Sequence, residues 1–141
     1  MSAFKRIECT AIVERDILLK ALESLGLEYT EHATPQKLHG YTGDVREQQA
    51  EIIVTRQALN KQFTGGSNDL GASFNSDKGA YDLIVSDFDA AQKIPQRIKQ
   101  AYAKCAIEKH LKLHKFANIN VTGNISERKK TKVGIIASKI I

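Results

Sequence analysis

The sequence predicts one α+β domain over residues 1–141, in which two amphipathic helices cover one face of a mostly antiparallel sheet. Two segments carry apolar residues at three- and four-residue steps, the spacing that gives a helix one apolar face. Around them, several short runs either alternate apolar and polar residues or are continuously apolar, as strands do. Because strands outnumber helices and hairpin turns are frequent, antiparallel pairing is favoured over a doubly wound parallel sheet.

The first half of the chain is predicted to form a strand, a helix and two further strands. Residues 4–12 alternate well enough for a half-buried strand. The first helical stripe occupies residues 14–26 and ends at Gly26, which suits a helix C-terminus because glycine accepts a positive φ. A strand over 27–32 precedes a turn-rich stretch, and the apolar run within 50–55 predicts a strand buried on both faces.

The second half begins with a predicted loop and hairpin and continues with the second helix. Pro95 suits the start of that helix, because the first N–H groups of a helix have no intrahelical partner. The predicted elements are a loop over 60–70, strands over 70–74 and 80–86, a helix over 95–114, and strands over 117–122 and 132–140. The predicted order is therefore β-α-β-β-β-β-α-β-β, a two-layer sandwich loosely similar to a ferredoxin.

Composition excludes several classes of protein. No apolar stretch approaches the roughly 20 residues of a membrane span. The N-terminal segment MSAFKRIECT alternates like a strand and lacks the apolar core of a signal peptide, so we expect a cytoplasmic protein. Cys9 and Cys105 form no ligand-spaced pair and are predicted to be small, buried apolar residues.

The whole chain has a formal net charge of +5, and its positive charge is densest in the C-terminal third. The densest run is the predicted hairpin loop, and the second helix adds further lysines; the residues concerned are Arg128, Lys129, Lys130, Lys132, Lys109 and Lys112. Such a patch favours an anionic ligand or nucleic acid. The alternative is a solvated turn whose charges keep a sheet edge from pairing. The absence of interleaved aromatic residues favours this alternative over single-strand binding.

A pair of histidines on the second helix is the weak candidate for a metal site. His110 and His114 are four residues apart, so both imidazoles lie on one helix face. A catalytic zinc helix places a glutamate directly after the first histidine, where Leu111 stands here. Lys109 and Lys112 would also repel a cation. We therefore predict that the histidines complete a basic helix end, and that no metal is bound.

Other motifs imply neither a catalytic residue nor a cofactor. The glycine-bearing segment 64–68 lacks the lysine-serine pair and the strand-to-helix context of a nucleotide-binding loop. Asp82, Asp87 and Asp89 straddle a strand end and suit a turn better than a calcium site. No serine lies in a nucleophile elbow.

Five segments, in order, resemble a known family over nearly the whole chain: MSAFKRIECTAIVERDILLKALESLG, LHGYTGDVREQQAEIIV, DLGASFN, GAYDLIVSDFD and IPQRIKQAYAKCAIEK. The family resembled is the uncharacterised hypothetical chloroplast reading frame, a domain of unknown function found in cyanobacteria, algal plastids and some phages. The resemblance implies a fold and no mechanism, and it adds the plastid stroma and the phage-infected cell to the expected compartments. The loop over 61–69 and the lysine-rich C-terminal hairpin depart from the family pattern.

Three functional hypotheses follow. The leading hypothesis is a non-enzymatic accessory or binding protein that meets a protein partner, a second copy of itself or an anionic partner through its sheet edge or basic hairpin. The alternative is a small-ligand binder that sequesters an anionic nucleotide or a nucleotide-like signal. The third is an enzyme of unknown reaction, which has no positive support in the motifs.

Overall fold

The structure, a computed structural model, describes residues 3–63 and 67–122, with side chains as far as His114. Its elements are β1 (Phe4–Glu8), α1 (Arg15–Ser24), β2 (Thr30–His39), β3 (Val45–Val54), α2 (Arg56–Gln62), β4 (Leu70–Asn75), β5 (Ala80–Ser86), α3 (Asp87–Ala91) and α4 (Ile94–Thr122). The chain divides into two compact units, Met1–Tyr102 and Ala103–Ile141, and the whole sheet belongs to the first. The prediction of one domain stays a prediction.

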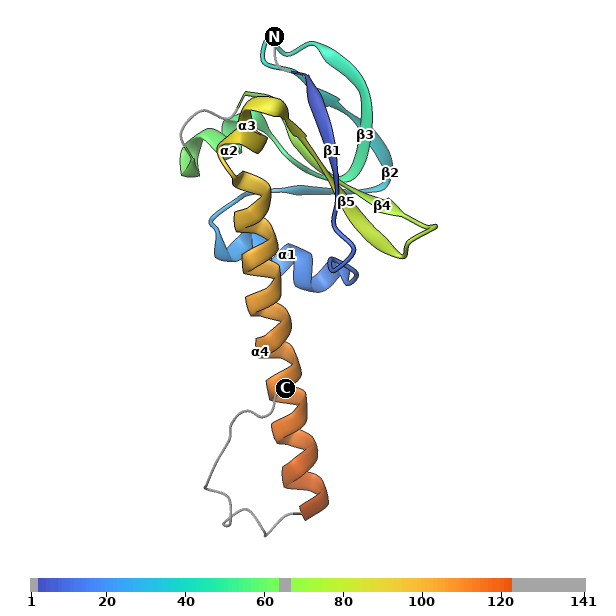
Figure 1. Ribbon diagram of the computed structural model, residues 1–141, viewed down its shortest axis with the longest axis vertical. Helices are drawn as coiled ribbons and strands as arrows, with labels where there is room; N and C mark the ends of the chain where they lie inside the picture. The colour runs from blue at the N-terminus through green and yellow to red at the C-terminus, as the bar shows by residue number, and fades with distance from the viewer. Residues whose placement is uncertain (1–2, 64–66, 123–141) are drawn as a thin grey trace. The chain divides into compact units, whose positions relative to one another are not determined.

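The sheet has five strands in the order β1-β5-β4-β3-β2, and every neighbouring pair is antiparallel. Figure 1 shows the strands together, with the short helices α2 and α3 at the ends of strands. The α+β class and the antiparallel sheet predicted from the sequence are thus confirmed. None of the described helices is both long enough and apolar enough to cross a bilayer.

The centre of the sheet is buried on both faces. Residues paired across antiparallel strands share a face, so Ile53, Gly71 and Ile84 form one row. Their chain neighbours Ile52, Ala72 and Leu83 form a second row on the opposite face. All of these positions are buried, and all seven residues of β5 are buried with them. The apolar run of β3 predicted to be buried on both faces is therefore confirmed.

The β2–β3 hairpin covers the face that carries Gly71. Leu38 and Ala50 come from the two strands of this hairpin and join Ile53 and Ile84 in one buried cluster. A Cβ on Gly71 would lie 2.7 Å from the Cβ of Ala50, so only glycine allows the hairpin this close an approach. Figure 1 shows β2 and β3 as curved strands. Part of the sheet is thus covered by its own strands.

The predicted apolar stripe of helix α1 is buried, but the side chain of its N-cap residue does not cap the helix. Gly26 ends the helical segment with φ +74°, as predicted, and its N–H donates to the carbonyl of Glu23. At the other end, the N-cap residue Glu14 makes no side-chain capping bond. Instead the hydroxyl of Tyr102 accepts from the N–H groups of Val13 and Glu14, at 3.2 and 3.0 Å. A residue of α4 therefore stabilises the start of α1.

Several predicted element boundaries are wrong. Short elements contain too few residues to show the repeat of apolar positions that identifies a helix or a strand. The strand predicted over 27–32 forms over Thr30–His39 and contains Pro35. Proline has no backbone N–H to donate, and an edge strand such as β2 tolerates this because one side of the strand pairs with no other strand. Two short helices, α2 and α3, were not predicted. Each starts at a capping side chain, because Thr55 accepts from the N–H of Ala58 and Ser86 accepts from that of Asp89.

The strand predicted over 117–122 is wrong, because α4 remains helical as far as Thr122. Six residues of apolar alternation do not distinguish a strand from the end of a helix. Extending a formed helix adds one hydrogen bond for each residue ordered, without a new nucleation cost. The observed order over the described residues is β-α-β-β-α-β-β-α-α. The predicted loop over 123–131 and the strand over 132–140 lie outside the described residues.

Candidate functional site

A cleft of roughly 410 Å³ lies where the β2–β3 turn meets the start of α2. Its volume falls in the range of about 300–1,000 Å³ that small-molecule sites occupy. The lining residues come from the turn, from the strand-to-helix junction and from the segment before β4: His39, Gly40, Tyr41, Thr42, Gly43, Thr55, Arg56, Gln57 and Asp69. The walls therefore come from three separate stretches of the first unit.

Asp69 holds these walls together. Its side chain is 8% exposed, and its two carboxylate oxygens accept from the backbone N–H groups of His39 and Arg56, at 3.0 and 2.9 Å. The N–H of Asp69 in turn donates to the carbonyl of His39, at 3.0 Å. The His39 ring is half exposed, with Nδ1 at 3.4 Å from Asp69 Oδ2. One buried carboxylate thus fixes the backbone of two cleft residues on different elements.

Arg56 and Tyr41 supply the cleft with a cation and an aromatic ring. The guanidinium carbon of Arg56 lies 4.8 Å from the centroid of the Tyr41 ring, within the range of a cation–π contact. Within residues 3–63 and 67–114, no carboxylate forms an ion pair with Arg56. The Tyr41 ring is 57% exposed, so part of it stays open to solvent beside the guanidinium. The pair therefore offers charge and a flat surface side by side.

The turn that carries Tyr41 satisfies its own charges. Asp44 accepts from the Arg46 guanidinium at 2.5 Å and from the Thr42 hydroxyl at 2.8 Å, and these contacts lower the pKa of Asp44 to about 2. Gly43 has φ +83°, a backbone conformation that favours glycine. A Cβ on Gly40 would lie 2.5 Å from the Arg46 guanidinium, so glycine lets this ion pair pack against the turn. The charges of Asp44 and Arg46 therefore neutralise each other within the turn.

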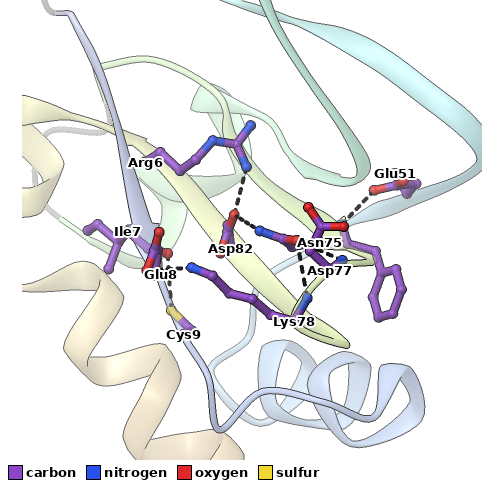
Figure 2. A network of polar contacts seen from close by, with 10 residues as sticks. Arg6, Ile7, Glu8, Cys9, Glu51, Asn75, Asp77, Lys78 and Asp82 are labelled. Atoms are coloured by element: carbon purple, nitrogen blue, oxygen red, sulfur yellow. Dashed lines mark hydrogen bonds and ion pairs between the residues drawn. The ribbon is translucent and has the colours of Figure 1, made fainter.

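A second polar cluster lies on the sheet, on strands β1, β4 and β5 (Figure 2). Asp82 is 2% exposed and accepts from Arg6 at 2.9 Å and from Asn75 at 3.4 Å. Beside it, Lys78 forms an ion pair with Glu8. Every charged side chain named here has an opposite charge as its partner. We therefore interpret this cluster as structural.

The predicted basic patch is only partly within the described residues. Lys112 is exposed and Lys109 half-buried on α4, and both belong to the second unit. The residues Arg128, Lys129, Lys130 and Lys132 lie outside the described residues. The proposal that this patch binds an anion or nucleic acid therefore stays a prediction, and none of its residues lines the cleft.

The metal candidates His110 and His114 lie on α4, four residues apart on one helix and both exposed. Over the described part of the chain, no three His, Cys, Asp or Glu side chains gather as a metal ion requires. Asp87 begins α3 and Asp89 is fully buried in it, so these carboxylates lead into a helical turn. Burial raises the pKa of Asp89 above its usual value, although hydrogen bonds with Ser86 and Ser67 act to lower it.

Both cysteines are free thiols. Cys9 is buried, as predicted, and burial raises the pKa of its thiol. Cys105 is only partly buried, so the prediction holds for one of the two residues.

Sequence reasoning missed the cleft residues His39, Tyr41, Arg56 and Asp69. They are separated by up to 30 residues, and no spacing rule brings together a turn, a helix start and a strand start. The segment Gly40-Tyr41-Thr42-Gly43 was a usable signal, because it places an aromatic residue in a turn and binding residues are disproportionately found on loops. The second signal was Thr55, a helix-capping residue directly after an apolar strand.

Comparison with known proteins identifies a family and no activity. The search of curated proteins and the search of solved structures each found no match. One family model matches residues 21–134, and its description is "Protein of unknown function (DUF1257)". That range covers most of the chain, from the last turn of α1 through every lining residue of the cleft to the end of α4. The chain belongs to this family of proteins of unknown function, DUF1257.

Proposed function

We propose that this protein binds a small anionic ligand, of about the size of a mononucleotide, in the cleft between the β2–β3 turn and α2. The observation that carries the proposal is the Arg56 guanidinium, which lies over the exposed ring of Tyr41 and has no ion-pair partner among the described side chains. Arginine binds phosphate and carboxylate groups through two parallel hydrogen bonds. The cleft volume of roughly 410 Å³ suits such a ligand.

Preorganisation of the cleft supports the proposal. The turn residues Asp44 and Arg46 neutralise each other, and Asp69 fixes the backbone at His39 and Arg56. A ligand therefore orders little of the protein when it binds, which lowers the entropic cost of binding. The half-exposed imidazole of His39 and the hydroxyls of Thr42 and Thr55 supply further hydrogen-bonding groups along the walls.

Binding through a sheet edge has less support. β1 and β2 are the two edge strands. β2 carries Pro35 and has register irregularities between Glu31 and Gln36 and between Lys37 and His39, all of which discourage pairing with another strand. A protein partner or a homo-oligomer stays a prediction, and so does the cytoplasmic or stromal location.

Thermal denaturation tests the proposal with the full chain. The panel contains adenosine, guanosine, cytidine and uridine, each as the nucleoside, the 5′-monophosphate and the 3′,5′-cyclic monophosphate. We expect at least one charged member to raise Tm in a concentration-dependent way, because a ligand that binds only the native state stabilises it. Titration calorimetry then gives Kd. A panel in which no member raises Tm would contradict the proposal.

Two arginine variants locate the site. Arg56→Gln removes the cleft cation, and we expect Kd to rise at least about tenfold. Arg97→Gln is the matched control, because Arg97 stacks on Phe63 at 4.9 Å in the same way but does not line the cleft. Its Kd is expected to stay within about twofold of the wild-type value. Equal losses in both variants would move the binding site away from the cleft.

A further inference from the structure

The cleft offers a ligand one permanent cation and places one buried carboxylate beside it. Arg56 contributes one positive charge, and His39 adds another only when its ring is protonated. Asp44 and Arg46 cancel each other at the turn. Asp69 contributes a negative charge that lines the cleft and is screened little by solvent, because its side chain is more than nine-tenths buried.

Asp69 cannot turn away from a bound anion. Both of its oxygens accept backbone N–H groups, from His39 on β2 and from Arg56 on α2, so any rotation would break one of these bonds. The amide donors stabilise the carboxylate, but they do not remove its charge as a guanidinium would. The Arg56 guanidinium pairs with one negative charge of a ligand. A second negative charge would lose water without gaining a cation, and it would meet an immobile carboxylate of the same sign.

We infer that the cleft selects a singly charged oxyanion, which in a nucleotide is a phosphodiester, over a doubly charged phosphomonoester of the same ring. This inference rests on the proposed function and adds the chemical class of the ligand. Arg56 neutralises the single charge, while the Tyr41 ring, more than half exposed, offers a surface for the planar base. Selectivity comes from Asp69, which acts on the excess charge of the ligand without being a contact for its phosphate.

The wild-type protein provides the first test. Calorimetric Kd values are compared for each base between the 3′,5′-cyclic monophosphate, the 5′-monophosphate and the nucleoside at pH 8. At that pH a phosphomonoester carries nearly two charges, because its second pKa is about 6. We expect the cyclic form of the preferred base to bind at least about tenfold more tightly than the 5′-monophosphate, and more tightly than the nucleoside.

Two variants test the cause of the selectivity. Asp69→Asn removes the charge and is expected to reduce the difference between the two phosphates to below about threefold, with circular dichroism reporting whether the fold is retained. Gln57→Lys adds a cation to the cleft wall and leaves the Asp69 hydrogen bonds in place. It should reduce the selectivity in the same direction, and it serves as the test if Asp69→Asn does not fold.

The outcomes separate this inference from the proposed function. If the 5′-monophosphate binds the wild type as tightly as the cyclic form or more tightly, the inference is wrong and the cleft still binds anions. Selectivity that persists unchanged in Gln57→Lys also overturns it, because charge would then not be the cause. If no member of the panel binds at all, the proposed function itself is wrong.

Discussion

The buried carboxylates of Asp82 and Asp69 are stabilised by different kinds of partner. Asp82 in the sheet cluster is neutralised by Arg6, a cation whose guanidinium lies 2.9 Å away. Asp69 in the cleft is stabilised by two backbone N–H groups, at 3.0 and 2.9 Å, and the His39 ring lies 3.4 Å away. Both solutions satisfy the desolvated carboxylate, which would otherwise raise the free energy of the folded state.

The difference lies in which charges are left for a ligand. In the sheet cluster, the pairs Arg6–Asp82 and Lys78–Glu8 use the cations that are present. In the cleft, backbone amides take the place of a cation, so Arg56 can lie over Tyr41 with its hydrogen-bond donors available. In this protein, the carboxylate held by amides therefore leaves its neighbouring arginine available to a ligand, whereas the carboxylate held by an arginine does not.

The largest effect is expected for removal of the cleft carboxylate. Asp69→Ala leaves the N–H groups of His39 and Arg56 without their acceptor, and we expect a loss of about 3 kcal/mol in the free energy of unfolding. Urea denaturation followed by circular dichroism measures it. Asp77→Ala is the control, because Asp77 is an exposed turn residue whose substitution should cost less than about 0.5 kcal/mol. Similar losses in both would show that the amide contacts of Asp69 stabilise little.

The two arginines should differ in the same experiment. Arg6→Gln leaves the buried carboxylate of Asp82 without its cation, and we expect a loss of about 2 kcal/mol, moderated because Arg6 itself is half exposed. Arg56→Gln should change stability by less than about 0.5 kcal/mol, since it breaks only an exposed cation–π contact. If Arg56→Gln proves the more destabilising of the two, the distinction between a structural and an available cation is wrong.

The smallest effect is expected for the stability of the protein at acid pH, through Asp44 in the turn beside the cleft. The pKa of Asp44 is lowered to about 2 by Arg46 and Thr42, from an ordinary value of 3.8. Because the folded-state pKa is the lower one, the stabilisation is present above pH 3.8 and is lost as the pH falls toward 2. Carbon-detected NMR titration of the Asp44 carboxyl measures this pKa directly. Arg46→Gln should return it toward 3.8, and an unchanged value would assign the shift to other groups.

Some of the fold was predictable because local pattern and tertiary structure agree. The α1 stripe, its end at Gly26 and the β4–β5 hairpin each carry a full repeat of their pattern in consecutive residues. The Asn75 side chain also accepts from the N–H groups of Asp77 and Lys78, so the turn is encoded within its own residues. Elements of this kind are readable from the sequence because they do not depend on distant contacts.

The rest depends on distance along the chain. Pro35 and the polar residues around it read as a turn, yet they form an irregular part of strand β2, because Glu31 and Gln36 on either side pair with β3. Leu38 and Ala50 of the β2–β3 hairpin pack over Gly71, and no local residue pattern predicts this contact. The cleft shares this property, since Asp69 contacts residues 30 and 13 positions away. Chemistry that is assembled by such contacts is visible only in three dimensions.

The hydroxyl of Tyr102 also links the order of synthesis to the order of folding. Because it accepts the amide hydrogens of Val13 and Glu14, the beginning of α1 lacks its acceptor until residue 102 has left the ribosome. The earliest helix of the nascent chain is therefore completed by one of the last residues of the first compact unit. A fragment that stops short of this tyrosine lacks the hydroxyl that accepts the amide hydrogens of Val13 and Glu14.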